Sequence, residues 1–174
     1  MQNDSESARL RIAGITDDSI VDGPGIRLTV FVQGCPHNCE GCHNPQTHDF
    51  SAGVDMTVDE IMDRINANPL LDGVTFSGGE PFCQAKALSE LGQMVHKKGL
   101  NVVTYSGYTY EYLRKNSDSE NNFGKLLDVS DYLVDGPFIQ AQKDMLLKFR
   151  GSRNQRIIDV KKSEENGSAV TAKI

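Results

Sequence analysis

Short apolar runs alternate with amphipathic runs of helical length along most of this chain. The clearest apolar run, residues 26–32, is rich in β-branched side chains, and the turn-forming Asp22–Gly25 precedes it. This combination is typical of a strand entered from a tight turn. Alternation of strands with helices favours a parallel sheet joined by right-handed crossovers. The sequence therefore predicts an α/β fold with a mostly parallel sheet.

The same periodicities predict the other helices and strands. One helix begins at Thr57, which forms a capping box with Glu60, and ends before Pro69. A longer helix covers 81–98, whereas 44–55 has no clear period and predicts a loop. The remaining strands are expected at 73–76, 100–105, 132–134 and 156–160, and the remaining helices at 109–115, 125–129 and 138–149.

Length and composition predict a single domain over residues 1–174. The chain is 38% hydrophobic, which is enough for one ordinary core. Leu10, Ile12 and Ile15 predict a first strand at the edge of the sheet. Residues 1–8 and 161–174 are polar, and we expect them to lack regular structure. Only about five or six strand–helix units fit, too few for a closed eight-stranded barrel.

Charge and hydropathy exclude several classes of protein. The net charge is −6, and no basic run has the extent of a nucleic-acid footprint. No stretch approaches the ~18 apolar residues of a membrane span. The polar, acidic start of the chain lacks the pattern of a signal peptide. We therefore expect a cytoplasmic protein that contacts neither nucleic acid nor membrane.

Three cysteines lie within eight residues, immediately after the predicted strand 26–32. Cys35, Cys39 and Cys42 have the spacing Cys-x3-Cys-x2-Cys, and no fourth cysteine is near. Crowding of this kind in a chain without an export signal favours a metal site over disulfides. A [4Fe-4S] cluster normally has four cysteine ligands. With three, one iron keeps an open coordination site, which is what a catalytic centre needs.

Zinc is the main alternative for the three cysteines. It takes four ligands, and His37, His43 or His48 is close enough in sequence to supply the fourth. The usual zinc pattern includes a second ligand pair downstream, and none is visible. An electron-carrying ferredoxin is a poorer interpretation, because it needs a fourth thiolate.

The cysteine spacing and its surroundings resemble the radical S-adenosylmethionine enzymes. Asp22–Arg27 is similar to the entry of glycyl-radical-enzyme activases, and Ser77–Pro81 is similar to the second signature of the superfamily. Leu133–Phe138 and Phe149–Gln155 resemble the subgroup that acts on anaerobic ribonucleoside-triphosphate reductase. The resemblance covers roughly residues 9–160 and implies a partial, open βα barrel.

The resemblance implies a set of cofactor-binding residues. Cys35, Cys39 and Cys42 would bind the cluster, and S-adenosylmethionine would chelate the fourth iron. The backbone of Gly41, Cys42 and His43 would lie against adenine, with His43 either stacked on the base or at the surface. The residues of the glycine loop that would receive the methionine amino group are Ser77, Gly78, Gly79 and Glu80. Glu80 has a second interpretation, as a residue that only starts the following helix.

The resemblance also implies a reaction and partners. A donor such as flavodoxin reduces the cluster, and S-adenosylmethionine is cleaved to methionine and a 5′-deoxyadenosyl radical. That radical removes a hydrogen atom from a backbone glycine in the large subunit of the reductase. The alternatives are an activase of pyruvate formate-lyase type, a small radical enzyme acting on a pterin-like molecule, and a non-catalytic zinc-binding module.

Several further residues have two interpretations. Thr104–Gly107 ends a predicted strand and would either contact the cofactor or only terminate the strand. Arg150–Gln155 would either receive the partner's glycine loop or form a hydrogen-bonded turn, and Arg153 replaces a serine common in the subgroup. Cys83 is expected to be a buried free thiol. His96, near a helix C-terminus, is expected to be structural.

Overall fold

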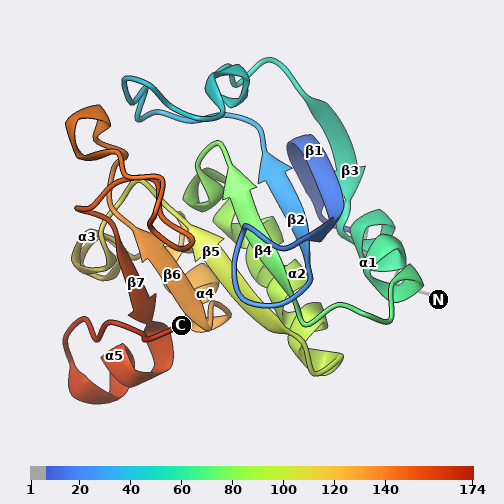
Figure 1. Ribbon diagram of the computed structural model, residues 1–174. Coiled ribbons are helices and arrows are strands. Elements are labelled where there is room, and N and C mark those ends of the chain that lie inside the picture. The colour runs from blue at the N-terminus through green and yellow to red at the C-terminus, as the bar shows by residue number, and fades with distance from the viewer. Residues whose placement is uncertain (1–6) are drawn as a thin grey trace.

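The computed structural model describes residues 7–174, which form one seven-stranded sheet with helices behind it (Figure 1). The strands are β1 (Arg9–Ser19), β2 (Arg27–Val32), β3 (Val54–Thr57), β4 (Gly73–Gly78), β5 (Asn101–Tyr105), β6 (Tyr132–Asp135) and β7 (Arg156–Asp159). The α-helices are α1 (Val58–Ala67), α2 (Ala85–Lys97), α3 (Tyr110–Lys115), α4 (Phe123–Asp128) and α5 (Val160–Asn166). Short 3-10 helices are η1 (Pro45–Thr47), η2 (Pro81–Gln84) and η3 (Gln140–Gln142).

The strand order is β3-β1-β2-β4-β5-β6-β7. The four central strands, β2, β4, β5 and β6, are parallel, whereas β1, β3 and β7 pair antiparallel. The α/β class and the parallel centre are therefore as predicted, and the sheet is mixed. β3 and β7 lie at its two edges, so the described strands form an open sheet. Its carboxyl ends meet on one side, where α/β proteins place their sites.

The first strand is not the edge strand that the sequence predicts. β1 lies between β2 and β3, and Arg9 pairs with Thr57 while Ile12 pairs with Val54. That partner comes from the segment 44–55, which was expected to be a loop and contains η1 and the start of β3. β3 has only four residues, which is too short for a strand period to be recognised.

One large core lies between the sheet and the helices. In β2 and β4, the fully buried Leu28, Val30, Val74 and Phe76 belong to it. α2 contributes Leu88, Leu91 and Val95, which are all fully buried, as the predicted helix face requires. The capping box of α1 is also present: Glu60 N–H donates to Thr57 Oγ1, and Thr57 N–H donates to the Glu60 carboxylate. No helix within residues 7–174 is long and apolar enough to span a membrane.

The segment between β1 and β2 crosses the opposite face of the sheet (Figure 1). That face carries a small apolar cluster around Val103 and Val134 and the buried polar side chains Arg27 and Thr75. Arg27, 0% exposed, supports that crossing. Its Nε donates to Thr75 Oγ1 at 2.7 Å, and its other nitrogens donate to the carbonyl oxygens of Pro24 (3.0 Å) and Val74 (2.7 Å). Burial lowers the pKa of Arg27 to about 10, so it remains charged at neutral pH. Its bonds tie the β1–β2 segment to β4.

Two predictions in the C-terminal third are wrong. Residues 138–149 were expected to form a helix but contain only η3 and an irregular loop. A core-facing helix would bury Met145 and Leu146, whereas here they are 80% and 92% exposed. The segment after 160 forms α5, which Asp159 caps by accepting from Lys162 N–H and which ends at Gly167. α5 buries mainly Val160 and Ser163 and therefore lacks an apolar stripe. The prediction for 1–8 falls largely on residues 1–6, outside the described chain.

Candidate metal and cofactor site

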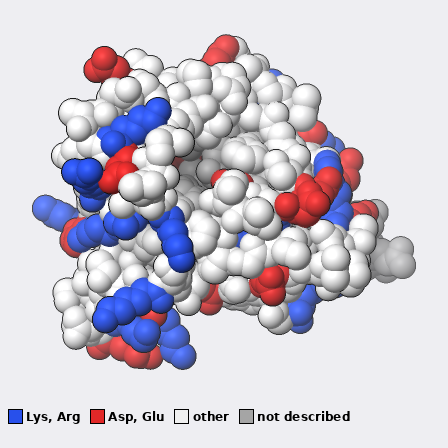
Figure 2. All heavy atoms as spheres, viewed as in Figure 1, with Lys and Arg blue, Asp and Glu red and all other residues white. Residues whose placement is uncertain are grey.

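The loops at the carboxyl ends of the four parallel strands border one cavity of about 590 Å³. Figure 2 shows this hollow on the face that also carries the β1–β2 segment. Its lining includes all three cysteines of the loop after β2, Ser77, Gly78 and Gly79 at the end of β4, Tyr105, Ser106 and Gly107 after β5, and Gly136 after β6. Residues from four separate parts of the sequence therefore meet at the edge of the sheet where the parallel strands end.

The glycine loop packs backbone against backbone on the start of the cysteine loop. Gly79 N–H donates to Val32 O at 2.8 Å, and Glu80 N–H donates to Gly34 O at 2.9 Å. A Cβ on Gly78 would lie 2.6 Å from the amide nitrogen of Val32, and Gly78 has a φ of 91°. Only glycine fits this position without strain. The two sequence motifs are thus held together by main-chain contacts.

Replacing Gly78 by alanine is therefore expected to lower the free energy of unfolding by about 3 kcal/mol, because backbone strain and a backbone clash add. Gly99→Ala is the matched control: its φ is 77°, but a Cβ there meets nothing within 4 Å. It should cost only about 1 kcal/mol from the φ angle. Chemical denaturation of both variants measures the difference. Equal losses would mean that the close approach to Val32 is not the cause.

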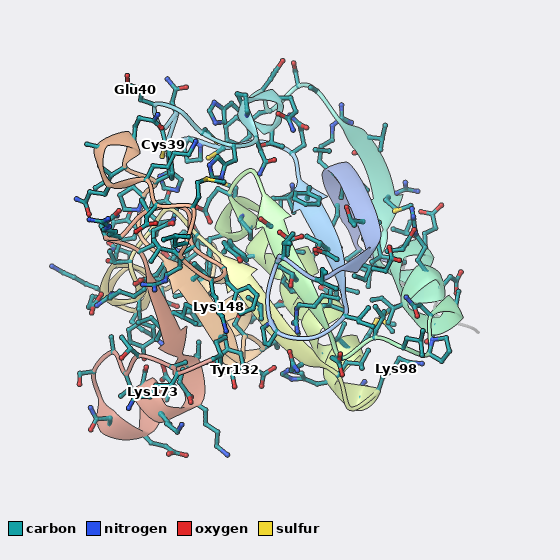
Figure 3. The ribbon with its side chains drawn as sticks, viewed as in Figure 1. Cys39, Glu40, Lys98, Tyr132, Lys148 and Lys173 are labelled. Atoms are coloured by element: carbon teal, nitrogen blue, oxygen red, sulfur yellow. The ribbon has the colours of Figure 1, made fainter. Side chains whose placement is uncertain are left out.

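Cys35, Cys39 and Cys42 are all half-buried and line the cavity. Asn38 and Gly41 have positive φ values of 49° and 71°, which turn the chain tightly between the cysteines. Burial raises the pKa of the Cys35 thiol. Figure 3 shows Cys39 beside Glu40 at the outer end of this loop.

Three thiolates on one loop are typical ligands of an iron–sulfur cluster. Within residues 7–174, no three His, Cys, Asp or Glu side chains are grouped closely enough to hold one metal ion. A cluster binds each thiolate through a different iron, so its ligands lie farther apart. His48 adds a polar group to the cavity, because its buried Nε2 has no hydrogen-bond partner. The lining residues thus suit an iron–sulfur cluster with a polar ligand beside it.

Cys83 is not a further ligand. It is exposed rather than buried, so the prediction of a buried thiol is wrong. It lines a different cavity, of about 680 Å³, together with Phe82 and Phe123. Desolvation, with Glu80 nearby, raises the pKa of its thiol to about 11, so the thiol stays protonated at neutral pH. The main cavity therefore has three cysteines and no fourth.

Glu80 joins the loops around the cavity. Its side chain is 0% exposed. The carboxylate accepts from Phe82 N–H at 3.0 Å, from Ser106 Oγ at 3.0 and 3.1 Å, and from Gly107 N–H at 2.9 Å. His37 Nε2 lies 2.6 Å from the same carboxylate. The carboxylate is enclosed by these donors, which favours the interpretation that Glu80 starts the following helix. It also joins the glycine loop to the loop after β5 and to His37 in the cysteine loop.

The contact between Glu80 and His37 was not expected from the sequence. His37 was considered only as a possible zinc ligand, but its ring faces Glu80 and packs edge-on against Tyr108, with ring centroids 4.4 Å apart. His37 belongs to the cysteine loop and Ser106 to the β5 loop, so one carboxylate connects three segments. The only sequence signal is a histidine between two cysteines, and nothing local identifies its acceptor.

Of the remaining candidate residues, His43 and Arg150 line the same cavity, whereas Arg153 and His96 do not. His43 is exposed, and its ring packs against Phe138 with centroids 5.0 Å apart. Arg150 lines the cavity and has a buried Nε without a partner. Arg153 instead points outward, 73% exposed, and pairs with Asp144 at 3.0 Å. His96 lies away from the site and bonds to a surface aspartate.

The chain is similar to known proteins over most of its length. Residues 21–158 match the family model of a 4Fe-4S single cluster domain. The anaerobic ribonucleoside-triphosphate reductase-activating protein of Vibrio cholerae is 40% identical over 149 residues, which cover 79% of this chain and 90% of that protein. The corresponding protein of Haemophilus influenzae is 36% identical over 148 residues, with the same coverage.

Two further proteins match a smaller share of the chain. The pyruvate formate-lyase-activating enzyme of Clostridium pasteurianum is 37% identical over 117 residues, which cover 62% of this chain and 49% of that enzyme. QueE from Escherichia coli covers 58% of this chain at 18% identity and a TM-score of 0.45, too low to support an argument. The identity and mutual coverage of the first two relatives decide the assignment. The chain belongs to the family of anaerobic ribonucleoside-triphosphate reductase-activating proteins, and its residues 21–158 form a 4Fe-4S single cluster domain.

Proposed function

We propose that this chain is a radical S-adenosylmethionine enzyme that installs a glycyl radical on an anaerobic ribonucleoside-triphosphate reductase. The observation that carries the proposal is the cavity at the strand ends, bordered by three cysteines and a glycine loop and lacking a fourth cysteine. Three ligands leave one iron open for a substrate. The relatives supply the identity of the reductase.

Each part of the cavity has a proposed role. Cys35, Cys39 and Cys42 hold the cluster. The main chain of Ser77, Gly78 and Gly79 receives the methionine portion of the cofactor, and Glu80 keeps that main chain in place from behind. Gly41, Cys42 and His43 are proposed to lie against adenine. This division is supported by the lining of the cavity, which includes His43 and the glycine loop.

The cluster and S-adenosylmethionine, when bound, supply one-electron reduction and the hydrogen-abstracting group. The protein's own contribution is geometric. Main-chain groups of the glycine loop orient the cofactor, because glycine lets a ligand approach the backbone closely. No described residue is required as a general acid or base.

The finer features are also proposed. We infer that residues 1–174 work as a single domain and that the sheet corresponds to the open, partial barrel implied by the resemblance. One continuous core behind the sheet and the three parallel strand pairs support this. A cytoplasmic location and a flavodoxin-like electron donor are expected from the same resemblance.

The decisive experiment is anaerobic. The protein is reconstituted with iron and sulfide, reduced with dithionite and given S-adenosylmethionine, and 5′-deoxyadenosine is assayed. Product that requires both cluster and reductant supports the reaction. A protein that binds about one zinc and forms no product would overturn the proposal. Such a protein is colourless, whereas one that holds an oxidised four-iron cluster is brown. Adding anaerobic reductase or pyruvate formate-lyase and recording the glycyl radical signal then separates the two activase alternatives.

A further inference from the structure

The most exposed apolar side chains of the described residues gather at the mouth of the cavity. Five large apolar residues are at least 70% exposed: Ile20 (71%), Val21 (70%), Leu70 (70%), Met145 (80%) and Leu146 (92%). Val21 and Leu147 line the cavity, so the two segments that carry Ile20, Met145 and Leu146 border it, and Leu146 itself lines a neighbouring cavity of about 440 Å³. Leu70 is the exception, because it precedes β4 at the opposite end of the strands. Clustered exposed apolar groups mark interaction sites, whereas single ones do not.

Both rim segments are anchored, so they present these side chains from defined positions. In the first, residues 17–22, Ser19 Oγ donates to the Asp22 carboxylate at 2.5 Å. In the second, residues 143–153, Lys143 and Ser152 form an antiparallel bridge. Tyr105 OH also donates to Phe149 O at 2.8 Å. We call residues 17–22 the acidic rim and residues 143–153 the basic rim.

The two rims differ in charge. The basic rim carries Lys143, Lys148, Arg150 and Arg153 against Asp144, which is four positive charges and one negative. The acidic rim carries Asp17, Asp18 and Asp22 and no basic residue, and Asp17 is paired with Arg64 at 2.6 Å, so Asp18 and Asp22 supply its net negative charge. Figure 2 shows Lys and Arg side chains gathered to the left of the hollow, and Figure 3 places Lys148 among them. A segment lying across the mouth would therefore meet opposite potentials on its two sides.

We propose that Ile20 on the acidic rim and Met145 and Leu146 on the basic rim form a clamp for the polypeptide segment of the reductase that bears its glycine. The inference rests on the proposed function. Hydrogen abstraction requires the glycine to come within about 3–3.5 Å of the reacting atom, so the glycine must enter the cavity and its flanking residues must cross the rims. An electron donor has no such requirement, because it need not enter the cavity.

The clamp predicts the chemistry of its occupant. The segment has apolar side chains on both sides of its glycine and acidic residues on the side that meets the basic rim. Buried apolar anchors carry most of the energy of such contacts, and rim charges mainly orient the partner and set the association rate.

The test uses the reconstituted full-length protein and its reductase. The clamp variants are the double substitution Met145→Asp/Leu146→Asp and, separately, Ile20→Asp. Leu70→Asp is the matched control, with the same chemistry and similar exposure on the far end of the sheet. Two activities are measured for each protein: dithionite-driven cleavage of S-adenosylmethionine without reductase, and formation of the glycyl radical on the reductase.

We expect both clamp variants to cleave S-adenosylmethionine at the wild-type rate and to bind and activate the reductase about 30-fold more weakly, the loss typical of an interface anchor. Leu70→Asp should match wild type in both assays. The clamp is refuted if its variants activate the reductase within about twofold of wild type. It is also refuted if they lose cofactor cleavage, because the rims would then act on the cofactor. Failure of the wild-type protein to cleave S-adenosylmethionine is distinct from both results and refutes the proposed function itself.

Discussion

Replacing Cys39 by alanine is expected to leave a folded protein that no longer cleaves S-adenosylmethionine. Cys39 lies half-buried in a loop that borders the cavity and takes no part in the main core. The free energy of unfolding of the apoprotein should therefore change by no more than about 0.5 kcal/mol. Loss of one of three ligands should reduce cofactor cleavage by more than about 100-fold, beyond the effect of removing a supporting contact. Iron content and 5′-deoxyadenosine formation measure both consequences.

Cys83→Ala is the matched control for that experiment. Cys83 is exposed, lines the other cavity and is not a proposed ligand. The variant should retain the iron content and the cofactor cleavage of the wild-type protein. Cofactor cleavage by Cys39→Ala at the wild-type rate would remove the basis for the proposed mechanism. Loss of the cluster in Cys83→Ala would show that the ligand set has been assigned wrongly.

Replacing Glu80 by alanine is expected to destabilise the fold about as much as Gly78→Ala does. The substitution leaves Phe82 N–H, Ser106 Oγ, Gly107 N–H and His37 without their common acceptor. Buried donors without a partner cost about 1–3 kcal/mol each, partly offset where water enters. We expect a loss of about 3 kcal/mol in the free energy of unfolding, or a fall in Tm of about 6–12 °C. Thermal denaturation of the apoprotein measures it.

The same substitution should also weaken cofactor binding, because the glycine and cysteine loops lose a shared anchor. Glu80→Gln keeps an acceptor oxygen and should recover part of both losses. His96→Ala removes a comparable histidine–carboxylate contact at the surface, where His96 Nε2 lies 3.0 Å from Asp131, and should cost less than about 1 kcal/mol. If Glu80→Ala were as stable as His96→Ala, the hydrogen bonds of the Glu80 carboxylate would not contribute to the stability of the fold.

Local patterns in the sequence were sufficient for the elements that have a strong period or a strong cap. β2 alternates clearly, α1 begins with a capping box, and α2 carries an apolar face, and each lies where it was predicted. The cysteine spacing and the glycine loop were also recognisable, because their chemistry depends on residue type and on separation along the chain. These features were enough to indicate the α/β class and the kind of cofactor.

Elements without such local signals were missed. β3 has four residues, and its place is decided by pairing with β1. Residues 138–149 contain apolar residues at a density that suggests a helix, yet Met145 and Leu146 are exposed. Hydrophobic periodicity indicates which residues would share one face of a helix. It does not indicate whether another part of the protein packs against that face. Such a packing surface exists only in the folded molecule or in a complex.

The sequence by itself determined that this chain carries three thiolates on one short loop, a glycine turn between a strand and a helix, and alternating strands and helices. Only the tertiary structure decided which residues hold these parts together. Glu80 and His37 are 43 positions apart, and Arg27 is 48 positions from Thr75. Such contacts follow from strand order and register, which depend on the packing of the whole chain. Local composition has no information about them, because the partner of a buried polar group can come from any segment that the fold brings within hydrogen-bonding distance.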